Sequence, residues 1–364
     1  MKLAIPKETA AGERRVALAP ESVAPLKKAG LEVQIQSGAG EGAFFADTEY
    51  EKAGARIVAD AGKLLGQADI VAKVQKPSSS EVDRLREGAV LIGFLQPASS
   101  AELIQRLAKR KIAAFAMEAI PRISRAQKMD ALSSQASIAG YKAALIAAGS
   151  LGKYFPMLMT AAGTVAPSKV LVLGAGVAGL QAIATARRLG AMVWGYDVRP
   201  VVKEQVESLG AKFLEFDLGL TDTQDKGGYA KELSDEAKRK QQEMLADKTK
   251  EFDVVLTTAL VPGKPAPKLI TKETVAGMRP GSVIVDLAAE TGGNCELTEP
   301  GKTVIKHGVI IHGPVDLPGT MPTHASQLYS RNVTALVQHL VKDGKLNLDF
   351  SDEIVKATCV TGRL

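Results

Sequence analysis

A glycine-rich stretch near the middle of the chain is the strongest chemical signal in the sequence. The run Gly174-Ala175-Gly176-Val177-Ala178-Gly179 follows the apolar segment 170–173 and precedes a helix-like segment. Asp197 stands eighteen residues after it, at the end of a second apolar segment. In this arrangement the glycines let the backbone approach a pyrophosphate at a helix N-terminus, and the carboxylate accepts the ribose hydroxyls. The pattern predicts a dinucleotide site, as opposed to a purely structural βα turn. Because Asp197 would repel a 2′-phosphate, it favours NAD(H) over NADP(H).

The elements that must position this site read as parallel α/β architecture. With 364 residues the chain is long enough for two domains, and short apolar runs alternate with helical patterns throughout. The expected strands are 3–5, 31–35, 70–74, 90–94, 113–117, 170–173, 192–196, 212–216, 253–257, 282–286 and 309–311.

Two long helices define the expected domain organisation. One, 134–153, is rich in small residues and could bridge two domains, and the other, about 326–341, returns the chain to the first. We therefore predict an α/β fold of two Rossmann-like domains with parallel sheets. The NAD(H)-binding domain, 135–317, is inserted into a first domain made of 1–134 and 318–364, and a cleft lies between them.

Composition excludes several other classes of protein. The net charge of +6 comes from 46 basic and 40 acidic residues, and only 4% of the residues are aromatic, so nucleic-acid binding has little support. Cys295 and Cys359 lie far apart, which fits a reducing compartment and no metal site. The N-terminus reads as a strand and no uncharged run resembles a membrane helix, so we expect a cytoplasmic chain without a signal peptide. Its end at Leu364 suggests a separately encoded subunit.

Two further segments resemble a known family. They are 121–134 (Pro-Arg-Ile-Ser-Arg-Ala-Gln-Lys-Met-Asp-Ala-Leu-Ser-Ser) and 257–267 (Thr-Thr-Ala-Leu-Val-Pro-Gly-Lys-Pro-Ala-Pro). Together with 163–179, 203–206 and 292–295, they resemble the NAD(H)-binding domain of proton-translocating nicotinamide nucleotide transhydrogenases. The resemblance covers essentially the whole chain, and its Arg-Ile-Ser-Arg-Ala-Gln motif is highly specific. The wider superfamily includes alanine dehydrogenase, which shares Arg15 and Lys73.

The resemblance implies that the chain passes a hydride from NADH directly to NADP⁺ held on a partner subunit. Arg122 would hold the nicotinamide carboxamide, and Asp130 and Ser133 would fix the nicotinamide ribose region. Gln127 would sit at the mouth of the site and reach the other nucleotide. The alternative interpretation of this loop is helix capping, for which Ser124 or Ser133 would be ordinary residues.

The resemblance also indicates further contacts and partners. A mobile loop would contain Gly228 and Tyr229, and the adenosine side would include Gln241 and Leu260. Other residues expected to contact the nucleotide are Ser124, Val198, Arg199, Thr258 and Ala259. The implied partners are an NADP(H)-binding subunit and membrane proton-channel subunits, which would hold the chain at the inner membrane. A homodimer is expected by resemblance and from the small-residue helix, although that face could be used inside the monomer.

Two other functions remain open. An alanine dehydrogenase moves a proton as well as a hydride and uses a histidine and a lysine, but the segment 94–97 has Gln96 at the histidine position. The four histidines begin at His307, so we expect none in the first domain. Transfer between two nicotinamides needs only positioning and exclusion of water, which would make Arg15 and Lys73 structural. The third possibility is an NAD-sensing regulatory module without a reaction of its own.

Overall fold

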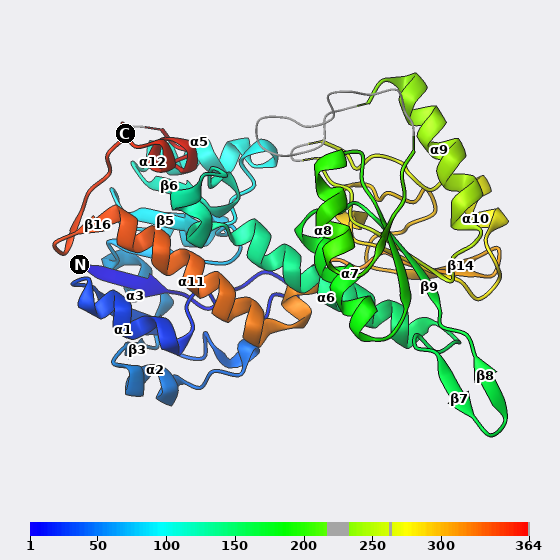
Figure 1. Cartoon of the computed structure of the whole chain (residues 1–364). Helices are drawn as coiled ribbons and strands as arrows, with labels where there is room; N and C mark the ends of the chain where they lie inside the picture. The colour runs from blue at the N-terminus through cyan, green and yellow to red at the C-terminus, as the bar shows by residue number, and fades with distance from the viewer. Residues whose placement is uncertain (217–232, 262–263, 363–364) are drawn as a thin grey trace. The chain divides into compact units, whose positions relative to one another are not determined.

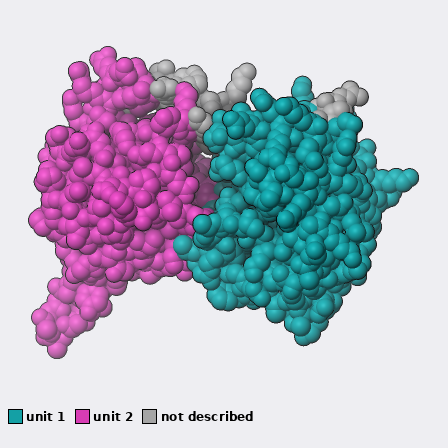
Figure 2. Space-filling view, turned by 180° about the vertical axis from the view of Figure 1, so that it is seen from behind, with its two compact units in different colours: residues 1–135, 318–364 teal, residues 136–317 magenta. Residues whose placement is uncertain are grey.

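The chain divides into two compact units in a computed structural model that describes residues 1–216, 233–261 and 264–362. The first unit comprises residues 1–135 and 318–364, and the second comprises 136–317 (Figure 1; Figure 2). The chain passes from the first unit to the second within α6 (Ala131–Ser150) and returns within η8 (Leu317–Thr320). Gly228 and Tyr229 lie outside the described residues.

Among the described residues, the first unit contains a six-stranded parallel sheet in the order β3-β2-β1-β4-β5-β6. Its strands are β1 (Lys2–Ile5), β2 (Glu32–Gln36), β3 (Arg56–Val58), β4 (Ile70–Ala72), β5 (Val90–Gly93) and β6 (Ala113–Ala116). Its helices include α1 (Val23–Lys28), α2 (Asp47–Ala53), α3 (Ala61–Gln67), α4 (Ser79–Arg84), α5 (Ala101–Lys109), α11 (Pro322–Leu340), α12 (Glu353–Thr358) and the 3-10 helix η5 (Ser124–Met129). Every residue of β4, β5 and β6 is buried, as expected for parallel strands covered on both faces. Strand β3 was not predicted, because this edge strand is short and incompletely buried.

The C-terminal segment completes the first unit. Helix α11 buries Tyr329, Val333 and Leu336 in the same core cluster as β1 and β2. After α12, Cys359 forms an antiparallel bridge with Phe115, and the Val360 N–H donates to the Ala114 carbonyl at 2.8 Å. These contacts cover the exposed edge of β6, which would otherwise be free to pair with another strand.

The second unit contains, within the described residues, a seven-stranded sheet in the order β11-β10-β9-β12-β13-β15-β14. All neighbouring strands are parallel except β14 and β15. The strands are β9 (Lys169–Leu173), β10 (Met192–Tyr196), β11 (Lys212–Phe213), β12 (Val254–Thr257), β13 (Val283–Asp286), β14 (Thr303–Lys306) and β15 (Val309–His312). The helices besides α6 are α7 (Val177–Arg188), α8 (Lys203–Ser208), α9 (Asp235–Thr249) and α10 (Lys272–Gly277).

Numbered within each unit, the parallel strands follow the same order, 3-2-1-4-5-6. This is the strand order of dinucleotide-binding Rossmann folds. The prediction of an α/β fold with two Rossmann-like domains and parallel sheets is confirmed. Among the described residues, no helix is long and apolar enough to cross a membrane.

The second unit also carries a hairpin that the sequence did not predict. Strands β7 (Leu158–Thr160) and β8 (Gly163–Val165) pair with each other and extend away from the rest of the unit (Figure 1; Figure 2). Met157 and Met159 are 58% and 75% exposed. Because Pro156 and Pro167 flank this short segment, its sequence shows no clear strand pattern.

Candidate functional site

The glycine-rich turn lies between β9 and α7, at the carboxyl end of β9. Gly174 has φ +98°, and a Cβ there would lie 2.7 Å from the Thr258 hydroxyl oxygen. A Cβ on Gly179 would lie 1.8 Å from the Gly174 carbonyl oxygen. A Cβ on Gly176 would meet no atom within 4 Å, so the backbone there faces open space. With the α7 N-terminus beside it, including Val177 and Ala178, this turn fits a dinucleotide pyrophosphate.

Asp197 at the end of β10 holds the glycine turn and is paired with Arg199. Its Oδ2 accepts a hydrogen bond from the Ala175 N–H at 2.8 Å. The Arg199 guanidinium donates to both carboxylate oxygens, each at 2.8 Å, and the Arg199 N–H donates to Oδ1 at 2.9 Å. Ribose hydroxyls could reach this carboxylate only if Arg199 moved away from at least one oxygen. The guanidinium charge also offsets the repulsion of a 2′-phosphate that Asp197 alone would exert.

The loop after β12 is fixed beside the glycine turn by side-chain hydrogen bonds. The Thr258 hydroxyl donates to the Gly174 carbonyl at 2.9 Å. The fully buried Asn294 accepts from the Ala259 N–H at 3.0 Å and donates to the Ala259 carbonyl at 2.8 Å. Leu260, the next residue, is 48% exposed. Asn294 lies in the Gly-Gly-Asn-Cys segment of the resemblance, which was the available signal for its role.

Two other predicted nucleotide contacts are engaged within the second unit. Gln241 in α9 is buried, and its Nε2 donates to the Tyr196 hydroxyl at 2.9 Å. Burial raises the pKa of Tyr196 to about 12. Val198 packs against the core cluster that contains Tyr196. Adenosine contact by Gln241 stays a prediction, and in this structure the residue supports the end of β10.

The predicted reaction loop of the first unit contains η5. Its apolar residues Ala126 and Met129 are buried in the core of the unit. Arg122, Ser124 and Gln127 are exposed. The loop is therefore anchored by apolar side chains and presents the polar side chains of the motif to solvent.

Asp130 caps the long helix α6. Its Oδ1 accepts a hydrogen bond from the Ser133 N–H at 2.9 Å, and its Oδ2 accepts one from the Ser133 hydroxyl at 2.6 Å. Asp130 therefore has the capping role that the alternative interpretation gave to Ser124 or Ser133. Capping accounts for Asp130 and Ser133 without a ligand, but it leaves the exposed Arg122 and Gln127 unexplained.

The structure thus brings the predicted residues together in two separate groups. Those between 122 and 133 share one loop and helix start in the first unit. In the second unit, the described predicted residues between 174 and 199 and between 258 and 260 gather at the carboxyl ends of β9, β10 and β12.

Lys73 belongs to a buried ion cluster at the carboxyl ends of β1 and β4. Its Nζ lies 2.7 Å from Glu81 Oε1 and 3.3 Å from Glu8 Oε2. Burial alone would raise the pKa of Glu81, but Lys73 and hydrogen bonds from Ser78 outweigh burial and lower that pKa. For Glu8 burial dominates and its pKa is raised. The positive charge of Lys73 is therefore paired with two carboxylates of the same unit.

Arg15 is also held by neighbouring side chains. Its guanidinium pairs with Glu13 at 2.6 Å and donates to Gln135 Oε1 at 3.0 Å. Gln96, at the position of the alanine dehydrogenase histidine, has φ +50°, and its side chain accepts from Lys76 Nζ at 3.4 Å.

The prediction that the first domain contains no histidine is wrong. Helix α11 returns to the first unit and brings His324 and His339 with it. His324 is exposed near the start of α11, and His339 Nε2 lies 3.2 Å from Asp352 Oδ1. The error came from reading sequence order as domain membership.

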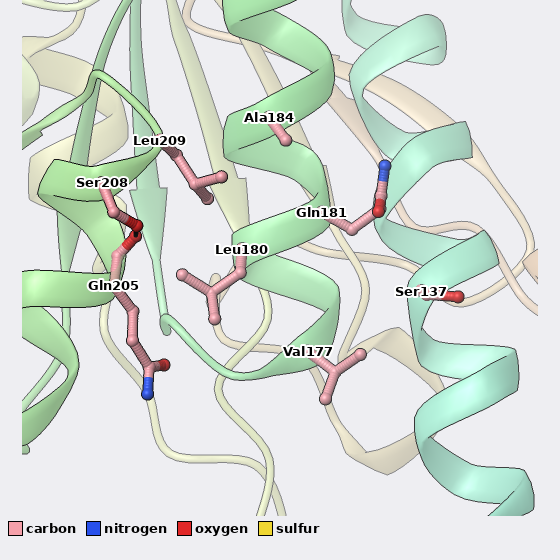
Figure 3. A pocket seen from close by; sticks show the side chains of 8 residues that line it. All are labelled: Ser137, Val177, Leu180, Gln181, Ala184, Gln205, Ser208 and Leu209. Atoms are coloured by element: carbon pink, nitrogen blue, oxygen red, sulfur yellow. Dashed lines mark hydrogen bonds between the residues drawn. The ribbon is translucent and has the colours of Figure 1, made fainter.

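A pocket of about 390 Å³ lies on the helical side of the second unit, among α6, α7 and α8 (Figure 3). It is lined by Ser137, Val177, Leu180, Gln181, Ala184, Gln205, Ser208 and Leu209. Of these, only Val177 belongs to the predicted nucleotide site. The pocket therefore does not mark that site, which the glycine turn and the ends of the strands define.

Comparison with known families and proteins gives a consistent assignment. Residues 4–139 match the family described as alanine dehydrogenase/PNT, N-terminal domain, and residues 143–363 match alanine dehydrogenase/PNT, C-terminal domain. The chain is 51% identical to an NAD(P) transhydrogenase subunit alpha protein of Rhodospirillum rubrum, over 99% of this chain and 96% of that protein.

Solved structures agree. The crystal structure of a transhydrogenase from Sinorhizobium meliloti matches with a TM-score of 0.87 and 44% identity, over 100% of this chain and 97% of that one. An L-alanine dehydrogenase matches with a TM-score of 0.82 and 30% identity, over 99% and 96%. The chain therefore belongs to the alanine dehydrogenase/PNT family, and its high identity places it beside the NAD(P) transhydrogenase alpha subunits.

Proposed function

We propose that the chain is the NAD(H)-binding subunit of a proton-translocating transhydrogenase. It passes a hydride from NADH to NADP⁺ bound on a partner subunit, and separate membrane subunits couple this transfer to proton movement. The second unit, with its glycine turn, is the NAD(H)-binding domain. The names of the similar proteins, transhydrogenase and transhydrogenase subunit alpha, support this proposal.

The observation that carries the proposal is the exposed position of the Gln127 side chain on an anchored loop. The loop buries Ala126 and Met129 on either side of it, so Gln127 is exposed on a firmly anchored turn. An uncharged amide cannot take up or release a proton near neutral pH, but it can hydrogen-bond a second polar molecule. Such a residue suits a reaction that depends on positioning.

Each group of residues has a defined part in this proposal. Bound NADH supplies the hydride from C4 of its nicotinamide ring. The α7 N-terminus holds the pyrophosphate, while Asp197, released in part from Arg199, binds the adenosine ribose. Arg122 orients the nicotinamide carboxamide, and Gln127 aligns the nucleotide on the partner so that the two reacting carbons lie about 3–3.5 Å apart.

Alanine dehydrogenation is the second candidate function, because the fold and 33% identity to a Staphylococcus aureus alanine dehydrogenase leave room for it. The side chains of this chain oppose it. Gln96 cannot act as a general acid or base, and Lys73 is paired with Glu8 and Glu81. We therefore expect no turnover with L-alanine and NAD⁺, or with pyruvate, ammonia and NADH.

A direct assay tests the proposed function against both alternatives. The purified chain is mixed with the NADP(H)-binding partner subunit, and hydride exchange between NADH and NADP⁺ is followed. Transfer that requires both proteins supports the proposal. Alanine-dependent turnover at ordinary dehydrogenase rates, about 1–10³ s⁻¹, would favour the second candidate. NADH binding with neither reaction would favour a regulatory module.

We also propose that the chain forms a homodimer. Ala143, Ala144 and Ala147 of α6 are fully buried within the second unit, so this face of the small-residue helix is already used. The β7–β8 hairpin is a better candidate surface, since Met157 and Met159 are exposed there. Light scattering at micromolar concentration is expected to give a dimer, and Met159→Glu is expected to weaken it.

A further inference from the structure

The attachment of the Gln127 loop to helix α11 indicates a role for a residue outside every predicted site. We propose that Asn332 is a positioning residue for hydride transfer. Its side chain, on helix α11, sets the position of the Gln127 loop. The inference rests on the proposed function, because it concerns how the chain holds the loop that the transfer requires.

The side-chain amide of Asn332 bridges two points of the segment 121–134, which contains Gln127. Its Nδ2 donates to the Lys128 carbonyl at 2.9 Å, and its Oδ1 accepts from the Ser134 hydroxyl at 2.7 Å. Lys128 directly follows Gln127, and Ser134 directly follows Ser133. One buried amide therefore ties the end of η5 to the start of α6, on either side of the Asp130 cap.

Apolar packing and an exposed ion pair also attach the loop, but they constrain its position less than the Asn332 hydrogen bonds do. Ala126 and Met129 hold the loop by apolar packing, which tolerates small sliding movements. Arg125 pairs with Asp352, but its side chain is 49% exposed, and solvent weakens such pairs. Asn332 is 7% exposed, and its two hydrogen bonds are directional. Among these contacts it is the one that fixes both the distance and the orientation of the segment.

The consequence follows from the sensitivity of a positioning reaction. A misplacement of about 1 Å can lower the rate about 10²-fold. Loss of the Asn332 amide removes the side-chain donor to the Lys128 carbonyl and leaves the Ser134 hydroxyl bonded within α6, to the Ala131 carbonyl at 3.0 Å. The backbone beside Gln127 is then no longer tied to α11 by this amide, so it can shift. The nucleotide-binding turn in the second unit keeps all its contacts, so NADH binding changes little while transfer slows.

The test compares two substitutions on the same helix. Asn332→Ala removes the bridge. Ser330→Ala is the matched control, because Ser330 is likewise a buried polar residue of α11. Its hydroxyl accepts from the Ala19 N–H at 2.9 Å and donates to the Ser22 hydroxyl at 2.7 Å, away from the loop. Ser134→Ala removes one of the two hydrogen bonds of the bridge. It provides a second test if the Asn332 variant proves unstable.

Three measurements are made on each variant. They are hydrogen–deuterium exchange of residues 121–134 in the chain alone, NADH affinity, and single-turnover transfer with the partner subunit. We expect Asn332→Ala to speed exchange in this segment and to slow transfer about tenfold or more, with NADH affinity changed less than about threefold. Ser134→Ala should give a smaller change in the same direction, and Ser330→Ala should match the wild type in transfer and in loop exchange.

The outcomes separate this inference from the proposed function. Absence of transfer in the wild-type chain would contradict the proposed function. Faster exchange with unchanged transfer, unchanged exchange, or an equal loss of transfer in Asn332→Ala and Ser330→Ala would overturn the role of Asn332.

Discussion

The two units have the same parallel strand order, yet the residues at the point where that order reverses differ: charged side chains in the first unit and glycines in the second. In the first unit the reversal lies between β1 and β4, and Lys73 directly follows β4. In the second it lies between β9 and β12, and Gly174 directly follows β9. Ligands of such folds bind outside the carboxyl ends of the strands at this reversal. The topology alone therefore offers two candidate sites.

Side chains decide between them. In the first unit, the reversal point holds a buried ion cluster in which one cation, Lys73, is shared by two carboxylates, Glu8 and Glu81. In the second unit, Gly174 and Gly176 contribute no side chain, and the backbone at Gly176 faces open space. Function follows the side chains at the site and not the fold that carries them.

The largest expected effect comes from breaking the ion cluster. Lys73→Met leaves two buried carboxylates without their cation, which is expected to lower the free energy of unfolding by about 3–5 kcal/mol. The comparison predicts that this damage stays structural, so the folded fraction binds NADH as the wild type does. Urea unfolding and NADH titration measure the two effects, and a selective loss of NADH affinity would give the cluster a role in binding.

The opposite substitution fills the open site of the second unit. Gly176 has an extended backbone, φ −77° and ψ −167°, which valine tolerates, and its Cβ would point into open space. Gly176→Val should therefore leave the melting temperature nearly unchanged. NADH affinity should fall at least about 10²-fold, or about 3 kcal/mol, because the side chain would occupy the place proposed for the pyrophosphate. Unchanged affinity would show that the nucleotide binds elsewhere.

A smaller effect concerns which nucleotide the open site prefers. Asp197→Ala removes the carboxylate that would repel a 2′-phosphate, so it should narrow the preference for NADH over NADPH. Arg199→Ala removes the charge that offsets this repulsion and should widen the preference about tenfold, or about 1.4 kcal/mol. Titration of both variants with both nucleotides checks the pair. If both substitutions shift the preference in the same direction, the two residues do not act against each other.

The smallest effect is a pH dependence of stability at the end of β10. Burial raises the pKa of Tyr196 to about 12, above the ordinary value of 10.0 in the unfolded chain. The stabilisation by neutral Tyr196 is fully present below pH 10 and is lost as the pH rises towards 12. Tyr196→Phe should cost about 1 kcal/mol at neutral pH, because Gln241 loses its acceptor, and should lose less stability than the wild type over that alkaline range. Equal alkaline losses would contradict this.

The sequence allowed prediction of features whose signal is local. The glycine turn, with Asp197 at a fixed distance along the chain, and the buried strands, as continuous apolar runs, were predicted from the pattern of residues. The Gln127 loop was singled out only by its resemblance to a family motif. The hairpin and β3 were missed because each is short and neither has the full burial that makes a strand recognisable.

The supporting residues could not be predicted, because their partners are distant in sequence. Asn332 lies 198 residues from Ser134 and 204 from Lys128, and nothing in the pattern of α11 singles it out. The pairing of Arg199 with Asp197 depends on rotamers that spacing does not specify. Only the three-dimensional contacts reveal which polar residues hold the loops.

The most direct test of the account is the substitution Gln127→Asn. The shorter side chain keeps the amide but withdraws it by one methylene, and the NADH contacts proposed for Arg122 and the glycine turn are left unchanged. Stopped-flow transfer from NADH to NADP⁺ on the partner subunit, with NADH affinity measured alongside, should show transfer slowed at least about 10²-fold at nearly unchanged affinity. Unchanged transfer at unchanged affinity would contradict the claim that this loop carries the reaction.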